Sequence, residues 1–231
     1  MELREQEILA QRQKRKRIRI YKLIFRWTIL VLIIFGLIFG SIKAINYFFN
    51  KDISIINTNK ALNVKTLTAP DYVDVQMITN ITARKGKELK EIKDIVIHYT
   101  GNPTSTAQNN RDYFNKFTTT VCSHFVVGLD GEIIQCLPID EVSAASNHRN
   151  KDTISIEVCH PDATGKFNQE TYASLVKLTS WLCDNSDLKK ENIIRHYDVT
   201  GKYCPLYFVE HEDEWETFKS DVENEMEKLR G

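Results

Sequence analysis

Two histidines and one cysteine have the residue types and the spacing of a metal site. His98 ends a predicted buried strand and is followed by Tyr-Thr-Gly, His196 ends a second predicted strand, and Cys204 comes eight residues after His196. Two imidazoles and one thiolate leave one position of a tetrahedral zinc ion open for water, which is typical of catalytic zinc. Water on such an ion ionises at about pH 7 and becomes a nucleophile. By spacing alone, both histidines could instead make ordinary hydrogen bonds.

The apolar patterns predict an α/β domain with a mixed sheet, in which these residues lie at strand ends. Residues 92–99 form a near-continuous apolar run, as expected of a central strand. Asp130-Gly131 between two apolar runs predicts a hairpin. Strands are predicted at 92–99, 121–127, 132–137, 153–158 and 193–196, and an irregular loop follows the last of them. Three helices are predicted: one at 105–117, one that begins after a cap at Asn168, and one at 212–229. Helices on the faces of the sheet complete this architecture.

The composition excludes a disordered chain and contains a charge asymmetry. Of the 231 residues, 42% are hydrophobic and 27% are charged, which is enough apolar surface for a packed core. Residues 1–26 carry nine Lys or Arg and three Glu, a net charge of +6, whereas the whole chain is neutral, so the remainder carries −6. A basic segment before an acidic body indicates membrane orientation or a nucleic-acid-binding arm.

The residues that follow favour the membrane. Residues 27–42 contain no charge, and with the apolar residues just before them about 20 residues could cross a hydrocarbon core ~30 Å thick. The basic cluster at 14–17 should remain cytoplasmic, so everything after residue 43 is expected on the other side of the membrane. The predicted order is a basic cytoplasmic tail at 1–22, a transmembrane signal anchor at 23–43, a juxtamembrane stalk at 44–74 and an exported domain at 75–231. A cleaved signal peptide is the main alternative, and a buried core helix is another.

Four segments together resemble a known family. IVIHYTGNP, VCSHFVVGLDGEIIQ, NKDTISIEVC and IIRHYDVTGKYCP occur in this order, and over roughly residues 75–225 the chain resembles the zinc-dependent N-acetylmuramoyl-L-alanine amidases. That fold is shared by T7-type lysozyme and the peptidoglycan recognition proteins. The resemblance implies that His98, His196 and Cys204 bind Zn²⁺ and that Glu157 helps to activate the water. The exported domain would then be an amidase catalytic domain.

Two further residues have a physical role in such a reaction. Attack on an amide carbonyl needs a base near the water, and Glu157 is the candidate carboxylate. Lys202 and the zinc ion can together stabilise the developing oxyanion. Alternatively, Glu157 forms a buried salt bridge and Lys202 is a solvated loop charge. Some family members carry a catalytic Tyr where this chain has Ser123, so a Tyr-assisted mechanism is in doubt; a small residue here is similar to the bacterial branch.

The other histidines and cysteines are assigned by position. We expect His124 to line the wall of the cleft, and His148 and Asn150 to lie in a loop that contacts substrate. His160 and His211 are expected at the surface. The remaining cysteines, either free thiols or disulfide-bonded, are Cys122, Cys136, Cys159 and Cys183.

The sequence therefore predicts a single-pass protein of the cell membrane, with a cytoplasmic N-terminus and a zinc-dependent hydrolase on the cell-wall side. Its substrate would be peptidoglycan, cleaved at the amide between N-acetylmuramic acid and the L-alanine of the stem peptide. One alternative is a peptidoglycan-binding module without activity on the same fold. A zinc endopeptidase acting within the stem peptide is another. No nucleic-acid partner is expected, because the exported domain is net acidic.

Overall fold

The computed structural model describes Trp27 and residues 67–230. Among these residues, no helix combines the length and the apolar character needed to cross a membrane. Apart from Trp27, the predicted cytoplasmic tail and anchor lie outside the described residues, as does the predicted stalk up to residue 66.

A mixed sheet forms the centre of the domain, as predicted. Its strands are β1 (Val73–Val75), β2 (Asp94–Tyr99), β3 (Phe125–Val127), β4 (Ile133–Gln135), β5 (Thr153–Val158) and β6 (Ile193–Arg195). They lie in the order β1-β4-β3-β5-β2-β6. The pair β3–β4 is antiparallel and is the predicted hairpin, whereas the other neighbouring strands run parallel. β1 begins at Val73, so the sheet starts slightly before the predicted domain boundary at residue 75.

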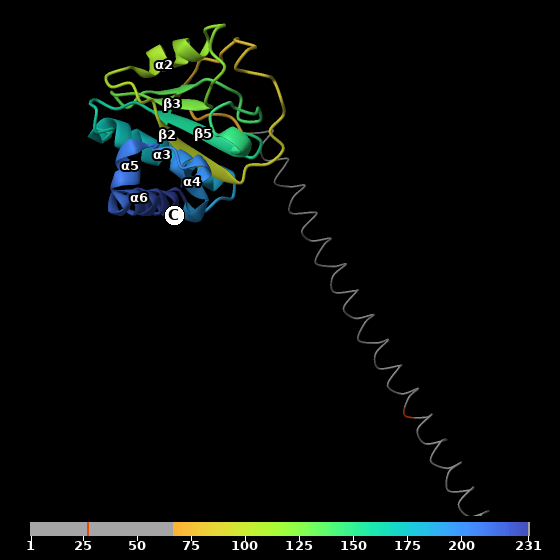
Figure 1. Ribbon diagram of the computed structural model, residues 1–231. Helices are drawn as coiled ribbons and strands as arrows, with labels where there is room; N and C mark the ends of the chain where they lie inside the picture. The colour runs from red at the N-terminus through yellow and green to blue at the C-terminus, as the bar shows by residue number, and fades with distance from the viewer. Residues whose placement is uncertain (1–26, 28–66, 231) are drawn as a thin grey trace, which may run out of the picture. The chain divides into compact units, whose positions relative to one another are not determined.

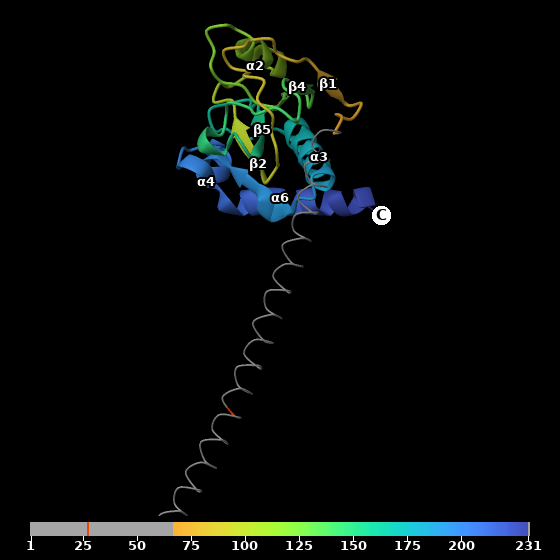
Figure 2. The same ribbon diagram turned by 90° about the vertical axis from the view of Figure 1, so that its right-hand side faces the viewer.

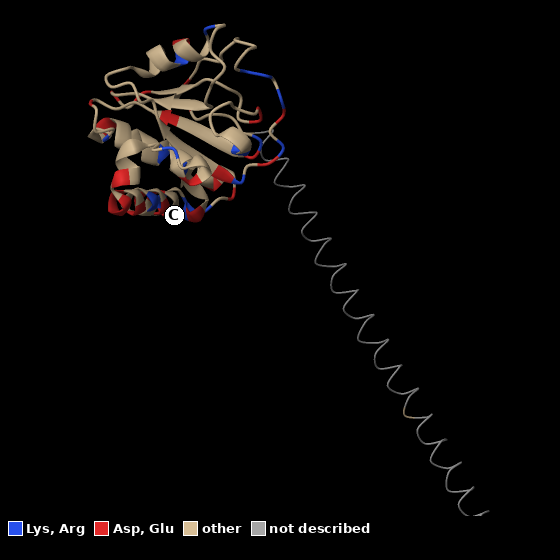
Figure 3. Cartoon of the chain, in the orientation of Figure 1, with Lys and Arg blue, Asp and Glu red and all other residues tan. Residues whose placement is uncertain are grey.

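Helices cover both faces of this sheet (Figure 1). They are α2 (Ala107–Phe114), α3 (Gln169–Asn185), α4 (His196–Thr200), α5 (Leu206–Glu210) and α6 (Glu212–Arg230), with the 3₁₀ turns η1 (Asn147–Arg149) and η2 (Lys190–Asn192). In both views α2 lies on one side of the sheet, and α3 and α6 lie on the other (Figure 2). Acidic residues are concentrated along α6 (Figure 3).

The alternation of side chains along each strand divides the core into two layers. Phe125 and Val127 of β3 belong to the apolar cluster that contains the buried residues of α3 and α6. Val126, between them, belongs to a second cluster with Ala107 and Phe114 of α2. Successive side chains of a strand point to opposite faces, so each strand contributes to both layers. We call the side that Val126 faces the α2 face of the sheet.

Local sequence signals set several element boundaries. The Asn168 side chain accepts a hydrogen bond of 2.8 Å from the Thr171 N–H and caps α3, as predicted. Gly131 has a φ of +79° in the β3–β4 turn, and a Cβ there would lie 2.9 Å from Ser174 Oγ. Glycine therefore suits this turn for both backbone and steric reasons. All five cysteines are buried free thiols.

The segment after β6 differs from its prediction as an irregular loop, because α4 begins there at His196. Asp198 explains the helix: its carboxylate accepts a hydrogen bond of 2.8 Å from the Arg195 N–H at the N-cap position. The helix ends at Gly201, which is left-handed with a φ of 77°.

Candidate metal centre and active site

His98, His196 and Cys204 converge although they are far apart in sequence. One donor atom from each residue lies within 4.8 Å of the others, and all three residues are buried. Cys204 Sγ is 3.8 Å from His98 Nδ1, and the centroids of the two imidazole rings are 4.6 Å apart. The three residues line a pocket of about 390 Å³. The predicted ligand set is thus brought together by the fold.

The register of the parallel strands explains why the two histidines and the glutamate lie close together. His98 in β2 is directly opposite Glu157 in β5, and Ile97 is opposite Arg195 in β6, so His196 follows beside His98. Because Ile97 packs in the layer formed with α3 and α6, His98 faces the other side of the sheet. Glu157 is opposite Val126 in β3 and shares its α2 face. Parallel strands present their carboxyl ends at the same edge, which places these groups together.

The turn after α4 returns the thiol to the histidines. The Gly201 N–H donates to the Tyr197 carbonyl at 2.7 Å, which closes the helix. The Tyr197 N–H then donates to the Cys204 carbonyl at 2.9 Å, so Cys204 lies back beside the start of α4. Cys204 is 2% exposed, as its position under this turn requires.

The free atoms of this cluster fit a zinc ion. His196 Nδ1 is buried and has no hydrogen-bond partner within the described part of the chain. Burial lowers the pKa of His98 well below 6.5, with further lowering by the charges of His196 and Lys202, and burial also lowers the pKa of His196. Both imidazoles are therefore neutral at pH 7, the state that binds metal. Burial raises the pKa of the Cys204 thiol to about 12, but a bound cation deprotonates a coordinating thiol.

Glu157 supplies a carboxylate beside the cluster. Its Oε2 atom is buried and makes no hydrogen bond to the described residues, which leaves it free toward the pocket that it lines. Burial raises the pKa of Glu157 to about 8, and the charge of Lys202 opposes this shift. Lys202 also lines the pocket and is exposed. Both residues predicted to assist the reaction therefore line the same pocket as the three candidate metal ligands.

The loop before β5 holds residues that the sequence did not single out. Asn147 lines the pocket, and its Oδ1 is 2.9 Å from His196 Nε2. Ser146 Oγ is 3.2 Å from His98 Nε2. Asn150 lines the pocket as expected of a substrate-contacting residue, although its Oδ1 accepts hydrogen bonds from the loop's own backbone. His148 is exposed and is not among the lining residues. No periodicity distinguishes one polar residue of this loop from the next.

His124 does not line the pocket, contrary to prediction. It is fully buried, its Nδ1 accepts a hydrogen bond of 3.0 Å from the Ser155 N–H, and its Nε2 is 2.8 Å from the Glu141 carbonyl. The ring thus joins β5 to the segment at Glu141 as a structural element. Ser123, just before it, is also fully buried and donates to the Phe125 carbonyl at 2.8 Å.

The prediction that His160 lies at the surface is wrong, because this residue is only 1% exposed. Its ring centroid lies 5.1 Å from that of Tyr99, and its Nδ1 is 2.7 Å from the Asp162 carbonyl. His211 is exposed, as predicted, and stacks on Tyr207.

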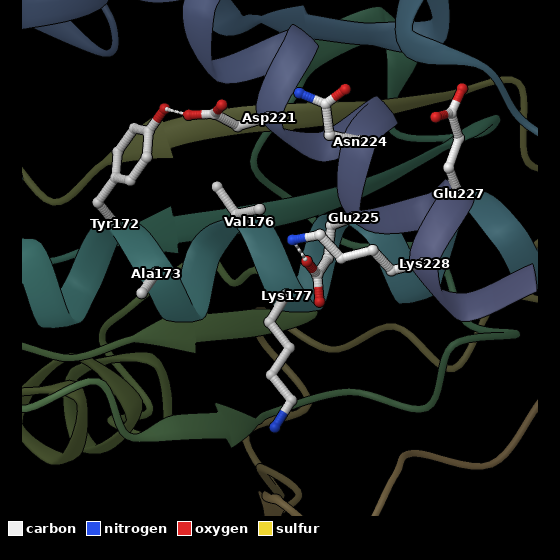
Figure 4. A pocket seen from close by; sticks show the side chains of 9 residues that line it. All are labelled: Tyr172, Ala173, Val176, Lys177, Asp221, Asn224, Glu225, Glu227 and Lys228. Carbon is white, nitrogen blue, oxygen red and sulfur yellow. Dashed lines mark hydrogen bonds and ion pairs between the residues drawn. The ribbon is translucent and has the colours of Figure 1, made fainter. Parts of the chain in front are cut away.

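A larger hollow of about 930 Å³ lies between α3 and α6 (Figure 4). Four of its polar residues form two pairs: the Tyr172 hydroxyl donates to Asp221 at 2.7 Å, and Lys228 lies 2.9 Å from Glu225. Within the described residues, the histidine–cysteine cluster is the one group of three potential metal donors, and it is not in this hollow. The chemistry of the domain is therefore concentrated at the sheet edge.

The fold and this site define an α/β domain with a candidate metal centre at one edge of its sheet, and comparison with known proteins identifies its family. The profile of the N-acetylmuramoyl-L-alanine amidase family (Amidase_2) matches residues 88–206, slightly more than half of the chain and all three metal-donor residues. The chain belongs to this family.

Individual relatives agree with the assignment. The N-acetylmuramoyl-L-alanine amidase CwlL of Bacillus licheniformis is 31% identical over 172 residues, which cover 67% of this chain and 46% of CwlL. The amidase BlyA of Bacillus subtilis is 28% identical over 176 residues, with the same two coverages. The solved catalytic domain of XlyA is 27% identical with a TM-score of 0.57, over 65% of this chain and 98% of that domain. The chain thus spans about half the length of these curated relatives and nearly all of the solved catalytic domain.

His124 makes the stability of the domain depend on pH. Its pKa is lowered from 6.5 to about 4 because burial disfavours the imidazolium. The unfolded chain therefore binds the proton first, and stability should fall as the pH drops from 6.5 toward 4, by about 3 kcal/mol at 1.36 kcal/mol per pKa unit. Replacing His124 with Gln, which can keep one acceptor and one donor, should remove this contribution and leave that of His98 and His196, whose pKa values are also lowered by burial. Denaturant unfolding of the metal-free protein at several pH values measures the difference.

His211→Gln is the matched control, because this histidine is exposed. It should retain the pH dependence of the wild type. An unchanged pH dependence in His124→Gln would contradict the structural role assigned to the buried ring.

Proposed function

We propose that the chain is a zinc-dependent peptidoglycan hydrolase that cleaves the amide bond between N-acetylmuramic acid and the L-alanine of the stem peptide. The observation that carries the proposal is the buried cluster of His98, His196 and Cys204 beside the free carboxylate of Glu157. The family membership of the chain supports the choice of bond. A non-catalytic binding module would need neither a complete set of three donors nor a buried carboxylate at the same pocket.

The three donors would hold the zinc ion, leaving one position of a tetrahedral shell for water or substrate. When bound, the ion supplies a Lewis acid that polarises a carbonyl and lowers the pKa of water. The protein's own contribution begins with burial, which lowers the pKa values of both imidazoles and so keeps them unprotonated.

Glu157 would transfer the proton. Its Oε2 is positioned to accept a proton from the attacking water, since this atom has no competing hydrogen bond among the described residues. The same oxygen can then give the proton to the nitrogen of L-alanine as the amide bond breaks. Burial raises the pKa of Glu157, which makes its carboxylate a stronger acceptor for the proton of the water, whereas the positive charge of Lys202, like that of a bound cation, favours the ionised form that must accept it. Lys202, on the rim of the pocket, would place positive charge near the oxyanion that forms on the carbonyl.

We also propose that residues 23–43 anchor the enzyme in the cell membrane, with the catalytic domain on the cell-wall side. The support is the uncharged run at 27–42 after a basic cluster at 14–17. An anchor of this kind would restrict cleavage to peptidoglycan close to the membrane.

Zinc binding should depend on the three donors. The purified full-length chain should carry about one zinc ion, as expected for three ligands and one open position. Cys204→Ala should lose most of this zinc, because two imidazoles alone do not complete the ligand set. Elemental analysis after dialysis measures the stoichiometry. Cys183→Ala is the control, because this thiol is also buried but packs in the core at α3, and it should keep the metal. Equal zinc in the Cys204 and Cys183 variants would refute the site.

Catalytic activity should depend on Glu157, whereas zinc binding should not. Glu157→Gln keeps the size of the side chain but cannot accept the proton, so the rate should fall by about 10²–10⁴-fold at unchanged zinc content. Release of soluble fragments from purified peptidoglycan measures the rate. The products of the wild type should be stem peptides with a free amino group on L-alanine, identified by mass spectrometry. Cleavage inside the stem peptide would replace the amidase proposal with the endopeptidase alternative, and binding without products would favour the non-catalytic module.

The anchor is tested by fractionation of cells that express the full chain. We expect the protein in the membrane fraction, released by detergent and not by high salt, with residues 23–43 retained in the mature chain. Soluble protein whose N-terminus follows residue 43 would show that the segment is a cleaved signal peptide.

A further inference from the structure

The loop from Ala144 to Asn150 places one side-chain oxygen against each imidazole of the cluster. Ser146 Oγ lies 3.2 Å from His98 Nε2, and Asn147 Oδ1 lies 2.9 Å from His196 Nε2. In each ring the loop contacts Nε2 and does not contact Nδ1. The Nδ1 of His98 is 3.8 Å from Cys204 Sγ, and that of His196 is buried without a partner among the described residues. The same nitrogen of both rings is therefore available to a metal.

The partner of each ring determines which nitrogen carries its proton. A neutral imidazole has one N–H and one lone pair, and an amide oxygen only accepts. The contact with Asn147 Oδ1 therefore selects the tautomer with the proton on His196 Nε2 and the lone pair on Nδ1. A hydroxyl oxygen can accept in the same way from His98 Nε2. Groups that fix the tautomer of a metal-binding histidine in this manner typically change metal affinity by 10–100-fold.

The backbone of the loop is built to present these two oxygens. The Asn150 side chain accepts hydrogen bonds from the Ala145 N–H at 3.0 Å and the Ser146 N–H at 2.6 Å. The Arg149 N–H donates to the Ser146 carbonyl at 3.0 Å. Asn147 has a φ of 53°, a left-handed conformation that asparagine and aspartate adopt more readily than other non-glycine residues. This position therefore favours the few residue types that combine that backbone with a side-chain acceptor.

We propose that Ser146 and Asn147 are positioning residues that hold His98 and His196 in the Nε2–H tautomer, with both Nδ1 atoms directed toward Cys204. The inference rests on the proposed zinc site. It adds that the metal affinity of the site is set by a loop that contributes no ligand.

Variants of Asn147 separate the side chain from the backbone. Asn147 is exposed, so removing its side chain creates no buried cavity. Asn147→Gly loses the acceptor but suits the positive φ, so it should weaken zinc binding by about 10–100-fold with no loss of thermal stability. Asn147→Ala should weaken zinc binding similarly, and Asn147→Asp, which keeps an acceptor oxygen, should restore most of the affinity. Competition with a chromophoric chelator measures zinc affinity in the full-length protein.

The tautomers give a readout that needs no metal. In the metal-free chain labelled with ¹⁵N-histidine, long-range ¹H–¹⁵N spectra at neutral pH should show His98 and His196 with the proton on Nε2. Asn147→Gly should turn His196 into a mixture of tautomers and leave His98 unchanged, and Ser146→Ala should do the reverse. Asp187→Gly is the matched control, because Asp187 also has a φ of 53° but follows α3, away from the pocket. This control should change neither zinc affinity nor the two tautomers.

Two outcomes would overturn the inference. One is an Asn147→Gly protein that binds zinc as tightly as the wild type with the His196 tautomer unchanged. The other is a wild-type, metal-free chain in which His196 carries its proton on Nδ1. If the wild type binds no zinc, the proposed zinc site fails, whereas the spectra of the metal-free chain still decide whether Ser146 and Asn147 orient the rings.

Discussion

Three parallel strands that end at one edge of the sheet are the constraint on which the site depends. Because β2, β5 and β6 run in the same direction, their carboxyl ends bring His98, Glu157 and His196 together. Because side chains alternate along a strand, these groups also share the α2 face. The apolar packing of Ile97 and Ile156 against the layer of α3 and α6 fixes that alternation. A slip of one residue in the register would direct the same polar groups into this apolar layer, which makes the correct register strongly favoured.

Burial gives the site its electrostatic character. It lowers the pKa values of both imidazoles and raises those of the Glu157 carboxyl and the Cys204 thiol to about 8 and about 12. Each shift favours the neutral form, so a domain without metal holds uncharged groups, two of which have buried atoms without a partner among the described residues. Unsatisfied buried polar atoms are costly. A cation at the three donors would recover that cost, which couples metal binding to the stability of the folded domain.

The sheet edge that carries the candidate metal site is also linked to the opposite layer of the domain. Arg195, the last residue of β6, is largely buried, and its Nη1 donates to Glu212 of α6 at 2.6 Å and to the Phe208 carbonyl of α5 at 2.9 Å. The next residue is His196. The position of His196 is therefore fixed from two sides. Arg195 connects it to α5 and α6, and Asn147 contacts its imidazole ring. The family match ends at residue 206, so α6 supports the site from beyond the matched segment.

The sequence by itself determined the features that depend on neighbouring residues: the buried central strand β2, the Asn168 cap of α3 and the turn at Gly131. With the family resemblance it also predicted the ligand set of His98, His196 and Cys204. Tertiary structure alone decided which polar residues reach the pocket. His124 is buried between β5 and the Glu141 segment, and Asn147, not its neighbour His148, contacts the ring of His196. The physical reason is that periodicity specifies the face of a strand, whereas contacts made by a loop depend on backbone conformation and on distant elements.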